Sequence, residues 1–220
     1  MSLLLHIDTS IETGSISISQ DEQVIASSCN ENRNDQAAWI HTAIRELLHQ
    51  AGMQLQHLQA ISISIGPGSY TGLRIGLATA KGLCYALNIP LITIPTLQMI
   101  AHAAAREPGD LIISMIDARR MEVYAAAYDK EFRERMPATA IILDQHSFAA
   151  QLKQNRVVFC GPGAIKFQQL SPDCNAVFSA SIAQSTDLIQ FALNKFEKQD
   201  FASLSYVEPF YLKEFYSSSH

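Results

Sequence analysis

Two aspartates stand at the ends of apolar runs in the two halves of the sequence. Asp8 ends the run LLLHID, and Asp117 ends the run LIISMID. A carboxylate at the end of a strand is well placed to hold a metal ion or a phosphate group in a cleft. The alternative is an Asx turn, in which the side chain binds its own backbone. Ser10 and the neighbouring hydroxyls fit either interpretation, as phosphate contacts or as turn residues.

A glycine-rich segment, GPGSYTG at residues 66–72, lies between a predicted strand and a predicted long helix. Backbone N–H groups in such a loop can bind an anion. The spacing does not match GxGxxG, because Thr71 replaces the third glycine, and GxxxxGK[ST] is absent. Pro67 also excludes the GxSxG elbow of serine hydrolases. A tight turn that needs small residues is therefore an equal alternative to an anion site.

The histidines and cysteines form no metal-binding pattern. None of the seven histidines belongs to an HxxxH or HExxH pair, and the four cysteines contain no CxxC. A metalloprotease centre or a zinc site of these kinds therefore lacks its ligands. We expect the cysteines to be buried and reduced.

The composition excludes several classes of protein. Sixteen Lys and Arg against 21 Asp and Glu give a net charge of −5, without a basic stripe, which argues against direct binding of nucleic acid. The 48 % hydrophobic content excludes a disordered chain. The uncharged stretch 82–105 is divided by Pro90 and Pro95, so we do not expect it to cross a membrane. Because no signal-peptide pattern is present, we expect a cytoplasmic protein.

The hydrophobic pattern predicts an α/β protein. Short or alternating apolar runs predict strands, and apolar residues three or four positions apart predict helices. The expected strands cover residues 3–8, 15–19, 23–29, 60–65, 91–94, 111–117, 122–128 and 157–160, and the expected helices cover 35–51, 71–87, 96–105 and 181–198. An aromatic tail follows, with Tyr206, Phe210, Tyr211, Phe215 and Tyr216.

The two halves repeat the same order of features. A strand ending in Ile-Asp opens each half, and a later strand in each half ends in Gly-Pro-Gly, at residues 66–68 and 161–163. This predicts a duplicated fold with two lobes, 1–106 and 107–220, whose strand-end loops face a common cleft.

The predicted helix at 71–87 carries a row of small residues, Gly72, Gly76 and Ala80. Small residues four apart allow another backbone to come close, which can be the chain's own sheet, another helix or a partner chain. On the preceding helix, Trp39 lies at the edge of the apolar stripe. It is either a core residue or an anchor for a partner.

Four segments resemble the TsaB (YeaZ) family: LLLHIDTS at the N-terminus, ISIGPGSYTGLRIGLATAKGLCYALNIPLITIPTL at 62–97, IDARRMEVYAAAYD at 116–129, and EPFYLKE near the C-terminus. The resemblance implies an actin/Hsp70-like (ASKHA) fold made of two ribonuclease-H-like halves. It also implies a role in forming threonylcarbamoyladenosine (t6A) in tRNA, as the non-catalytic partner of TsaD, together with the ATPase TsaE. The tRNA would then be reached only through the complex.

The resemblance also assigns residues. TsaD has a metal-binding HxxxH pair where this chain has Thr96 and Ile100, which implies that the chain requires no metal or cofactor. A residual cleft with weak ATP or ADP binding would involve Asp8, Ser10, Gly68, Asp117 and Gly161. The helices at 35–51 and 71–87 would bind TsaD, or a second copy when the chain is alone, through Trp39, Ile40, Leu47, Gly72, Leu73, Gly76, Ala80 and Leu83.

Two functions of other classes are the alternatives. An independent actin-fold phosphotransferase would bind magnesium and ATP, but the sequence shows no pair of phosphate-binding motifs. A peptidase acting on a TsaD-like partner would need metal ligands, and HxxxH is missing.

Overall fold

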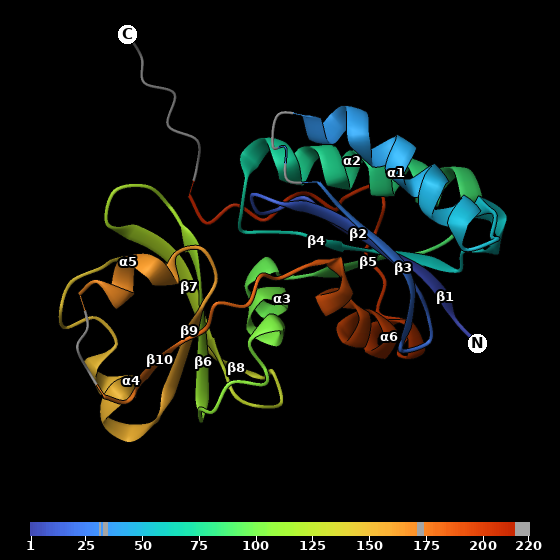
Figure 1. Cartoon of the computed structure of the whole chain (residues 1–220). Coiled ribbons are helices and arrows are strands. Elements are labelled where there is room, and N and C mark those ends of the chain that lie inside the picture. The colour runs from blue at the N-terminus through green and yellow to red at the C-terminus, as the bar shows by residue number, and fades with distance from the viewer. Residues whose placement is uncertain (31, 33–34, 171–173, 214–220) are drawn as a thin grey trace, which may run out of the picture.

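Two mixed sheets of five strands each form the framework of the molecule (Figure 1). The computed structural model describes residues 1–30, 32, 35–170 and 174–213. The first sheet has the order β3-β2-β1-β4-β5, and the second has the order β8-β7-β6-β9-β10. The strands of the first sheet are β1 (Leu3–Asp8), β2 (Gly14–Gln20), β3 (Gln23–Asn30), β4 (Ala60–Ser64) and β5 (Leu91–Ile94). Those of the second are β6 (Leu111–Asp117), β7 (Glu122–Tyr128), β8 (Glu134–Ile142), β9 (Val157–Cys160) and β10 (Ala176–Phe178).

The two sheets repeat one topology, which confirms the predicted duplication. In each, the first three strands along the chain form an antiparallel meander, and the fourth strand pairs in parallel with the first. The fifth strand continues the sheet in parallel. The α/β, actin-like architecture with ribonuclease-H-like halves is therefore present.

The helices cover both faces of the first sheet. α1 (Gln36–Gln50) and α2 (Tyr70–Leu87) lie on one face, while a short 3₁₀ turn, η3 (Ser185–Leu188), and α6 (Ile189–Glu197) lie on the other. Alternation along β1 explains this: Leu3, Leu5 and Ile7 join the core under α1 and α2, and Leu4 joins the core on the opposite face.

Two helices cross between the halves. α3 (Thr96–Ala103) follows the first sheet but packs on β6 and β7, and α6 belongs to the second half but packs on β5. The sheets themselves separate between β5 and β6, close to the boundary expected at residue 106. The short helices α4 (Ala149–Gln154) and α5 (Ala164–Gln168) belong to the second half, and η2 (Leu55–His57) precedes β4.

Several expectations require correction. The helix expected at 181–198 begins only at Ile189, after the 3₁₀ turn η3, and β8, β10, α4 and α5 were not predicted. β8 is an edge strand that contains Pro137, a residue that interrupts strand patterns and is tolerated at sheet edges. Cys29 and Cys174 are exposed, whereas Cys84 and Cys160 are buried. Phe215 and Tyr216 lie outside the described residues.

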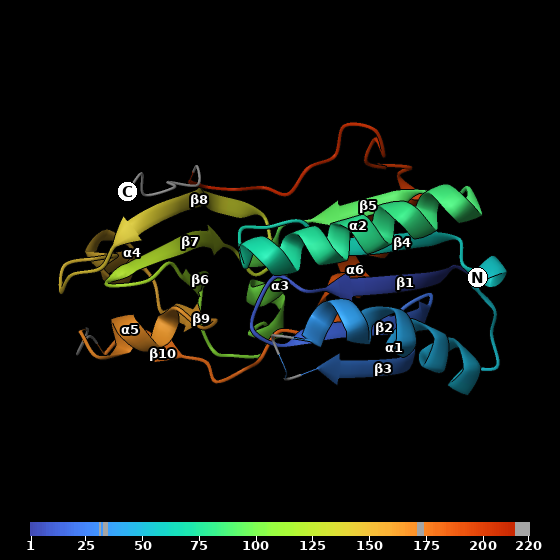
Figure 2. The same ribbon diagram turned by 90° about the horizontal axis from the view of Figure 1, so that it is seen from above.

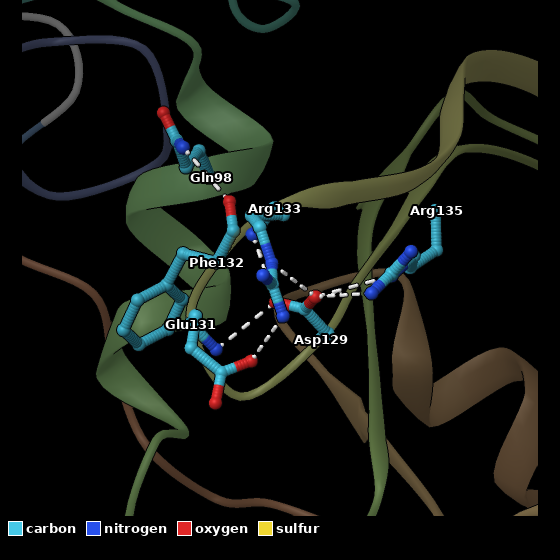
Figure 3. Close-up of polar contacts among 6 residues, drawn as sticks. All are labelled: Gln98, Asp129, Glu131, Phe132, Arg133 and Arg135. Carbon is cyan, nitrogen blue, oxygen red and sulfur yellow. Dashed lines mark hydrogen bonds and ion pairs between the residues drawn. The ribbon is translucent and has the colours of Figure 1, made fainter.

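A polar cluster fixes the β7–β8 turn against α3 (Figure 3). Asp129 accepts hydrogen bonds from the backbone and the Nε of Arg133, at 2.9 and 2.8 Å, and pairs with Arg135 at 2.8 Å. At the tip of the turn, Phe132 adopts a left-handed conformation with φ 58°. Its carbonyl accepts a hydrogen bond from Gln98 of α3 at 3.2 Å.

His102 of α3 joins three elements at the same junction. Its Nδ1 lies 2.9 Å from Oδ1 of Asp187 in η3, and its ring packs at 5.1 Å from Phe132 and 5.5 Å from Phe191 of α6. The two lobes are thus connected through side chains as well as through the chain. No helix among the described residues is long and apolar enough to cross a membrane.

Candidate functional site

Asp8 lies inside the first sheet, at the end of β1. Its Oδ1 accepts hydrogen bonds from the backbone N–H of Ser10 at 3.0 Å, from the hydroxyl of Ser10 at 2.5 Å, and from the hydroxyl of Ser64. Its Oδ2 is buried and has no hydrogen-bond partner. Burial raises the pKa of this carboxyl by more than the bonds from Ser10 and Ser64 lower it. The structure therefore shows the Asx-turn alternative.

Asp117 occupies a different environment, at the half-exposed end of β6. The ammonium of Lys166 in α5 donates to its Oδ1 at 2.7 Å, and the backbone N–H of Arg119 donates at 2.6 Å. Burial acts to raise the pKa of Asp117, but the bonds from Lys166 and Arg119 outweigh it, so the pKa is lowered. This carboxylate is ionised and already paired.

The glycine loop 66–72 is closed by its own contacts. A Cβ on Gly68 would overlap the carbonyl oxygen of Ser10, and one on Gly72 would overlap that of Thr9. The backbone N–H of Ser69 donates to the carbonyl of Ser10 at 2.7 Å, and its side chain caps α2 by accepting from Gly72. The glycines therefore serve close packing against the β1–β2 turn, as the tight-turn alternative required.

A cavity of about 460 Å³ lies between the two lobes. We call it the interlobe cavity. Of the five residues expected to form a nucleotide cleft, only Gly161 lines it; Asp8, Ser10, Gly68 and Asp117 do not. Its walls are Ile11, Glu12, Thr13, Ile100, Gly161, Pro162, Ala164, Ile165, Gln168, Phe178, Ser179, Ala180, Ser181, Ile182 and Ala183.

The residues present do not fit a nucleotide held through magnesium. Among the residues that the structure describes, the lining of the interlobe cavity contains no lysine or arginine to balance phosphate charge. Asp8 offers one buried oxygen, and Asp117 is bound to Lys166. Within the described ranges, no group of three or more His, Cys, Asp or Glu side chains is placed to hold a metal ion.

The positions that correspond to the TsaD metal ligands have structural roles here. Thr96 opens α3, and its hydroxyl accepts a hydrogen bond from the backbone N–H of Gly66 at 3.0 Å. Ile100 is 1 % exposed and belongs to the core between the lobes. Neither side chain is a metal ligand of the histidine type.

Most of the residues expected to contact a partner are buried in the chain's own core. On α2, the small residues face the sheet: a Cβ on Gly76 would overlap the hydroxyl of Thr9 and lie 3.1 Å from Ile63 of β4. Trp39 and Leu83 are partly exposed. The buried members of the set are Ile40, Leu47, Gly72, Leu73, Gly76 and Ala80.

Another side of α2 carries a second row of small residues, which the sequence analysis missed. Ala78, Gly82 and Ala86 are exposed, a Cβ on Gly82 would meet nothing within 4 Å, and Tyr85 beside them is 84 % exposed. The signal was available, because these residues also recur every four positions. The sequence does not say which of the two rows faces the sheet.

A shallow hollow of about 410 Å³ adjoins this row. It lies where the C-terminal half of α1 and the segment after it meet α2. Its lining is His41, Ile44, Arg45, Leu48, His49, Met53, Gln54, Leu55 and Leu83. We call the exposed row on α2, with Tyr85 and this hollow, the outer helical face.

Comparison with known proteins identifies the family. The model of TsaD, tRNA N6-adenosine threonylcarbamoyltransferase, matches residues 30–215. The tRNA threonylcarbamoyladenosine biosynthesis protein TsaB of Bacillus subtilis is 31 % identical over 173 residues, which cover 77 % of this chain and 75 % of that protein. The chain belongs to the TsaB (YeaZ) family. TsaB of Escherichia coli is 27 % identical over 220 residues, covering 96 % and 94 %.

Solved structures agree. YeaZ from Pseudomonas aeruginosa has a TM-score of 0.83 at 27 % identity and covers 96 % of this chain and 100 % of its own. A P. aeruginosa protein described as similar to the peptidase YEAZ has a TM-score of 0.86 at 26 % identity, covering 97 % and 100 %. The polyphosphate/ATP-glucomannokinase of Arthrobacter sp. strain KM, at 12 % identity and a TM-score of 0.51, shares only the fold. Proteins of the TsaB family take part in t6A biosynthesis, and the family is related to TsaD.

Proposed function

We propose that this chain is the non-catalytic subunit of a cytoplasmic t6A-modifying complex, where it dimerises with a TsaD-type threonylcarbamoyltransferase and supports it together with the ATPase TsaE. The observation that carries the proposal is the outer helical face. An aromatic side chain beside a row of small residues allows a partner helix to approach closely and to bury Tyr85. In the absence of TsaD, the same face would pair two copies of this chain.

A non-catalytic role is supported by Thr96 and Ile100. One completes a hydrogen bond to the glycine loop and the other fills the core, so both positions serve the fold rather than transfer chemistry. In this proposal the chain requires no cofactor. The partner chains would bind any nucleotide that the complex uses, an assignment supported by the described lining of the interlobe cavity, which contains no lysine or arginine.

The net charge of −5 supports an indirect contact with tRNA. A surface that holds a phosphodiester backbone draws its affinity from lysine and arginine. The partners would therefore supply most of the tRNA-binding surface, and this chain would act through its contact with TsaD.

An omission assay tests the proposal. Threonylcarbamoyl transfer to tRNA is measured with the adenylate synthase, TsaD and TsaE, with and without this chain, and tRNA nucleosides are read by mass spectrometry. We expect product only when both this chain and TsaD are present. Equal transfer without the chain would refute the proposed role.

Two matched variants locate the surface. Tyr85→Asp places a charge on the outer helical face, whereas Tyr206→Asp does the same at a side chain of equal exposure, 85 %, on the C-terminal segment. We expect Tyr85→Asp to abolish co-purification with TsaD, to make the isolated chain monomeric in sedimentation, and to lose transfer. Tyr206→Asp should leave all three unchanged. The opposite pattern would place the interface elsewhere.

A further inference from the structure

The proposed role in t6A formation assigns no ligand to the interlobe cavity. At about 460 Å³ it lies within the range of small-molecule sites, roughly 300–1,000 Å³. Both lobes contribute to it: the β1–β2 turn and α3 from one side, and the segment around Gly161, α5 and residues 178–183 from the other. A molecule bound there would contact both lobes at once.

The interior of the cavity is apolar. Ile11 and Ala183 are buried, and Ile100 is also closed to solvent. Ile165 and Ile182, by contrast, line the cavity while remaining 63 % and 70 % exposed. A ligand that covers these two exposed aliphatic side chains removes apolar surface from water. Burial of such surface stabilises the bound state by about 25 cal/mol per Å².

Phe178 indicates the shape of the ligand. Its ring stacks on Phe159 with centroids 5.4 Å apart and planes inclined by 25°. Phe159 is fully buried, whereas Phe178 is partly exposed and lines the cavity together with the flat ring of Pro162. A planar aromatic ligand would continue this stack, since offset stacking is a favoured arrangement of aromatic groups.

The polar groups of the cavity are neutral or acidic. Thr13, Gln168, Ser179 and Ser181 can exchange hydrogen bonds with a ligand. Among the described lining residues, Glu12 carries a formal charge, and Ser179 donates a hydrogen bond to Glu107 at 3.3 Å. An anion in this cavity would lose its hydration, and the described lining residues include no lysine or arginine to bind it.

We propose that the interlobe cavity binds a neutral, planar aromatic molecule with one or two hydrogen-bonding groups, and that it discriminates against nucleoside phosphates and other anions. The site belongs to this chain alone and does not depend on TsaD, so its test is independent of the proposed role in t6A formation.

The test uses aminoanthracene, a neutral aromatic amine whose emission rises in apolar surroundings, with the full-length chain. We expect saturable binding of one molecule per chain. Ile182→Asp and Ser181→Trp change exposed residues of the cavity and should weaken binding by about tenfold or more, because they add a charge or fill the mouth. The control Ile142→Asp changes an isoleucine that is 75 % exposed on β8 and outside the lining. It should stay within about twofold, as is usual for surface substitutions away from a site.

Competition separates the ligand classes. Anthracene carboxylate has the same ring system with a negative charge. The concentration needed to displace half of the probe should be about tenfold higher for the carboxylate than for a neutral anthracene derivative. ATP with magnesium should displace it less than adenosine does at equal concentration. The proposal is overturned if the carboxylate or ATP competes as well as its neutral counterpart, if the probe does not saturate, or if Ile142→Asp weakens binding as much as Ile182→Asp.

Discussion

At the scale of single residues, β1 places a carboxyl and an imidazole inside the first sheet. Asp8 carries a pKa raised by burial, so its ionised form is disfavoured in the folded state. A group of this kind stabilises the fold below its unfolded pKa, near 3.8, and that stabilisation is lost as the pH rises through the folded pKa. At neutral pH the folded protein therefore carries a penalty at Asp8.

The substitution Asp8→Asn tests this. The amide keeps the shape and an oxygen that accepts from Ser10 and Ser64, but it has no charge to desolvate. We expect the free energy of unfolding at pH 8 to equal or exceed that of the wild type, by about 1.4 kcal/mol for each unit by which the pKa is raised. The gain should vanish below pH 3.8. Urea unfolding at both pH values measures it, and a loss of about 2 kcal/mol at pH 8 would contradict the assignment.

His6 gives a second prediction, in which stability falls as the pH is lowered rather than as it is raised. Its ring nitrogens lie 2.6 Å from the hydroxyl of Ser62 and 2.9 Å from that of Ser19, and burial lowers its pKa to about 3. The unfolded chain takes up a proton near pH 6.5 and the folded chain does not. Stability is therefore complete above pH 6.5 and falls by about 1.4 kcal/mol per pH unit below it, toward pH 3.

Nuclear magnetic resonance tests the His6 prediction directly. We expect the ring C–H signals of His6 to stay constant between pH 8 and pH 5 in the folded protein. The ring signals that are missing from the spectrum of a His6→Gln variant are those of His6. A titration midpoint near 6.5 for His6 would show that the imidazole is not shielded as the structure indicates.

Sequence reasoning reached the position of these groups but not their environment. Asp8 was correctly placed at a strand end, because the change from apolar to polar residues is local. Its burial depends on Ser64, which lies 56 residues later on a parallel strand. That pairing is a tertiary fact, and the sequence alone left the Asx turn and the ligand interpretations equal.

At the scale of elements, α2 carries two rows of small residues on different sides. Gly76 and Gly82 are six positions apart, which at 3.6 residues per turn places them about 120° apart around the helix axis, so they belong to different faces. The spacing predicts both rows and cannot decide which one faces the sheet. The contact with Thr9 and Ile63 decides it for Gly76, while Gly82 faces open space.

The same substitution at these two glycines should have opposite effects. Alanine at Gly82 restores helix propensity without a contact, and should raise the free energy of unfolding by about 0.5–1 kcal/mol. Alanine at Gly76 forces its methyl group against the hydroxyl of Thr9 and should lower it by about 1–3 kcal/mol. Denaturant unfolding of the two variants gives the comparison. Equal effects would mean that α2 is oriented differently on the sheet.

At the scale of the whole molecule, the C-terminal segment packs against the first lobe, although it follows the strands of the second lobe in the sequence. Residues 201–213 form an extended strap that follows α6 and runs past β5 toward the second sheet (Figure 2). Ala202 pairs with Leu91 at the edge of β5, and the backbone N–H of Phe210 donates to the carbonyl of Ile65 at 2.8 Å. Lys213 then pairs with Glu122 in the second lobe.

The duplicated architecture was predictable because each half repeats its own strand-end residues. The path of the strap was not predictable, because the aromatic residues of the tail indicate that it packs on a surface but not which surface. Tyr211 packs against Tyr70 with ring centroids 5.2 Å apart and planes inclined by 32°, and its hydroxyl accepts a hydrogen bond from Arg74 at 3.1 Å. Gly66 is needed beneath it, because a Cβ there would overlap the carbonyl of Phe210.

Truncation of the strap should therefore lower local stability in the glycine loop and at the start of α2, and not elsewhere. In a chain that ends at Leu204, the glycine loop and the start of α2 lose the contacts of Phe210 and Tyr211, while α1 loses none of them. We expect amide hydrogen exchange in residues 65–75 to become at least about tenfold faster, with residues 36–50 unchanged. Tyr206→Ala is the control, because this side chain is 85 % exposed and its truncation leaves the strap in place. Uniform acceleration across both helices would show that the strap holds the whole fold rather than this loop, and unchanged exchange in residues 65–75 would show that it holds neither.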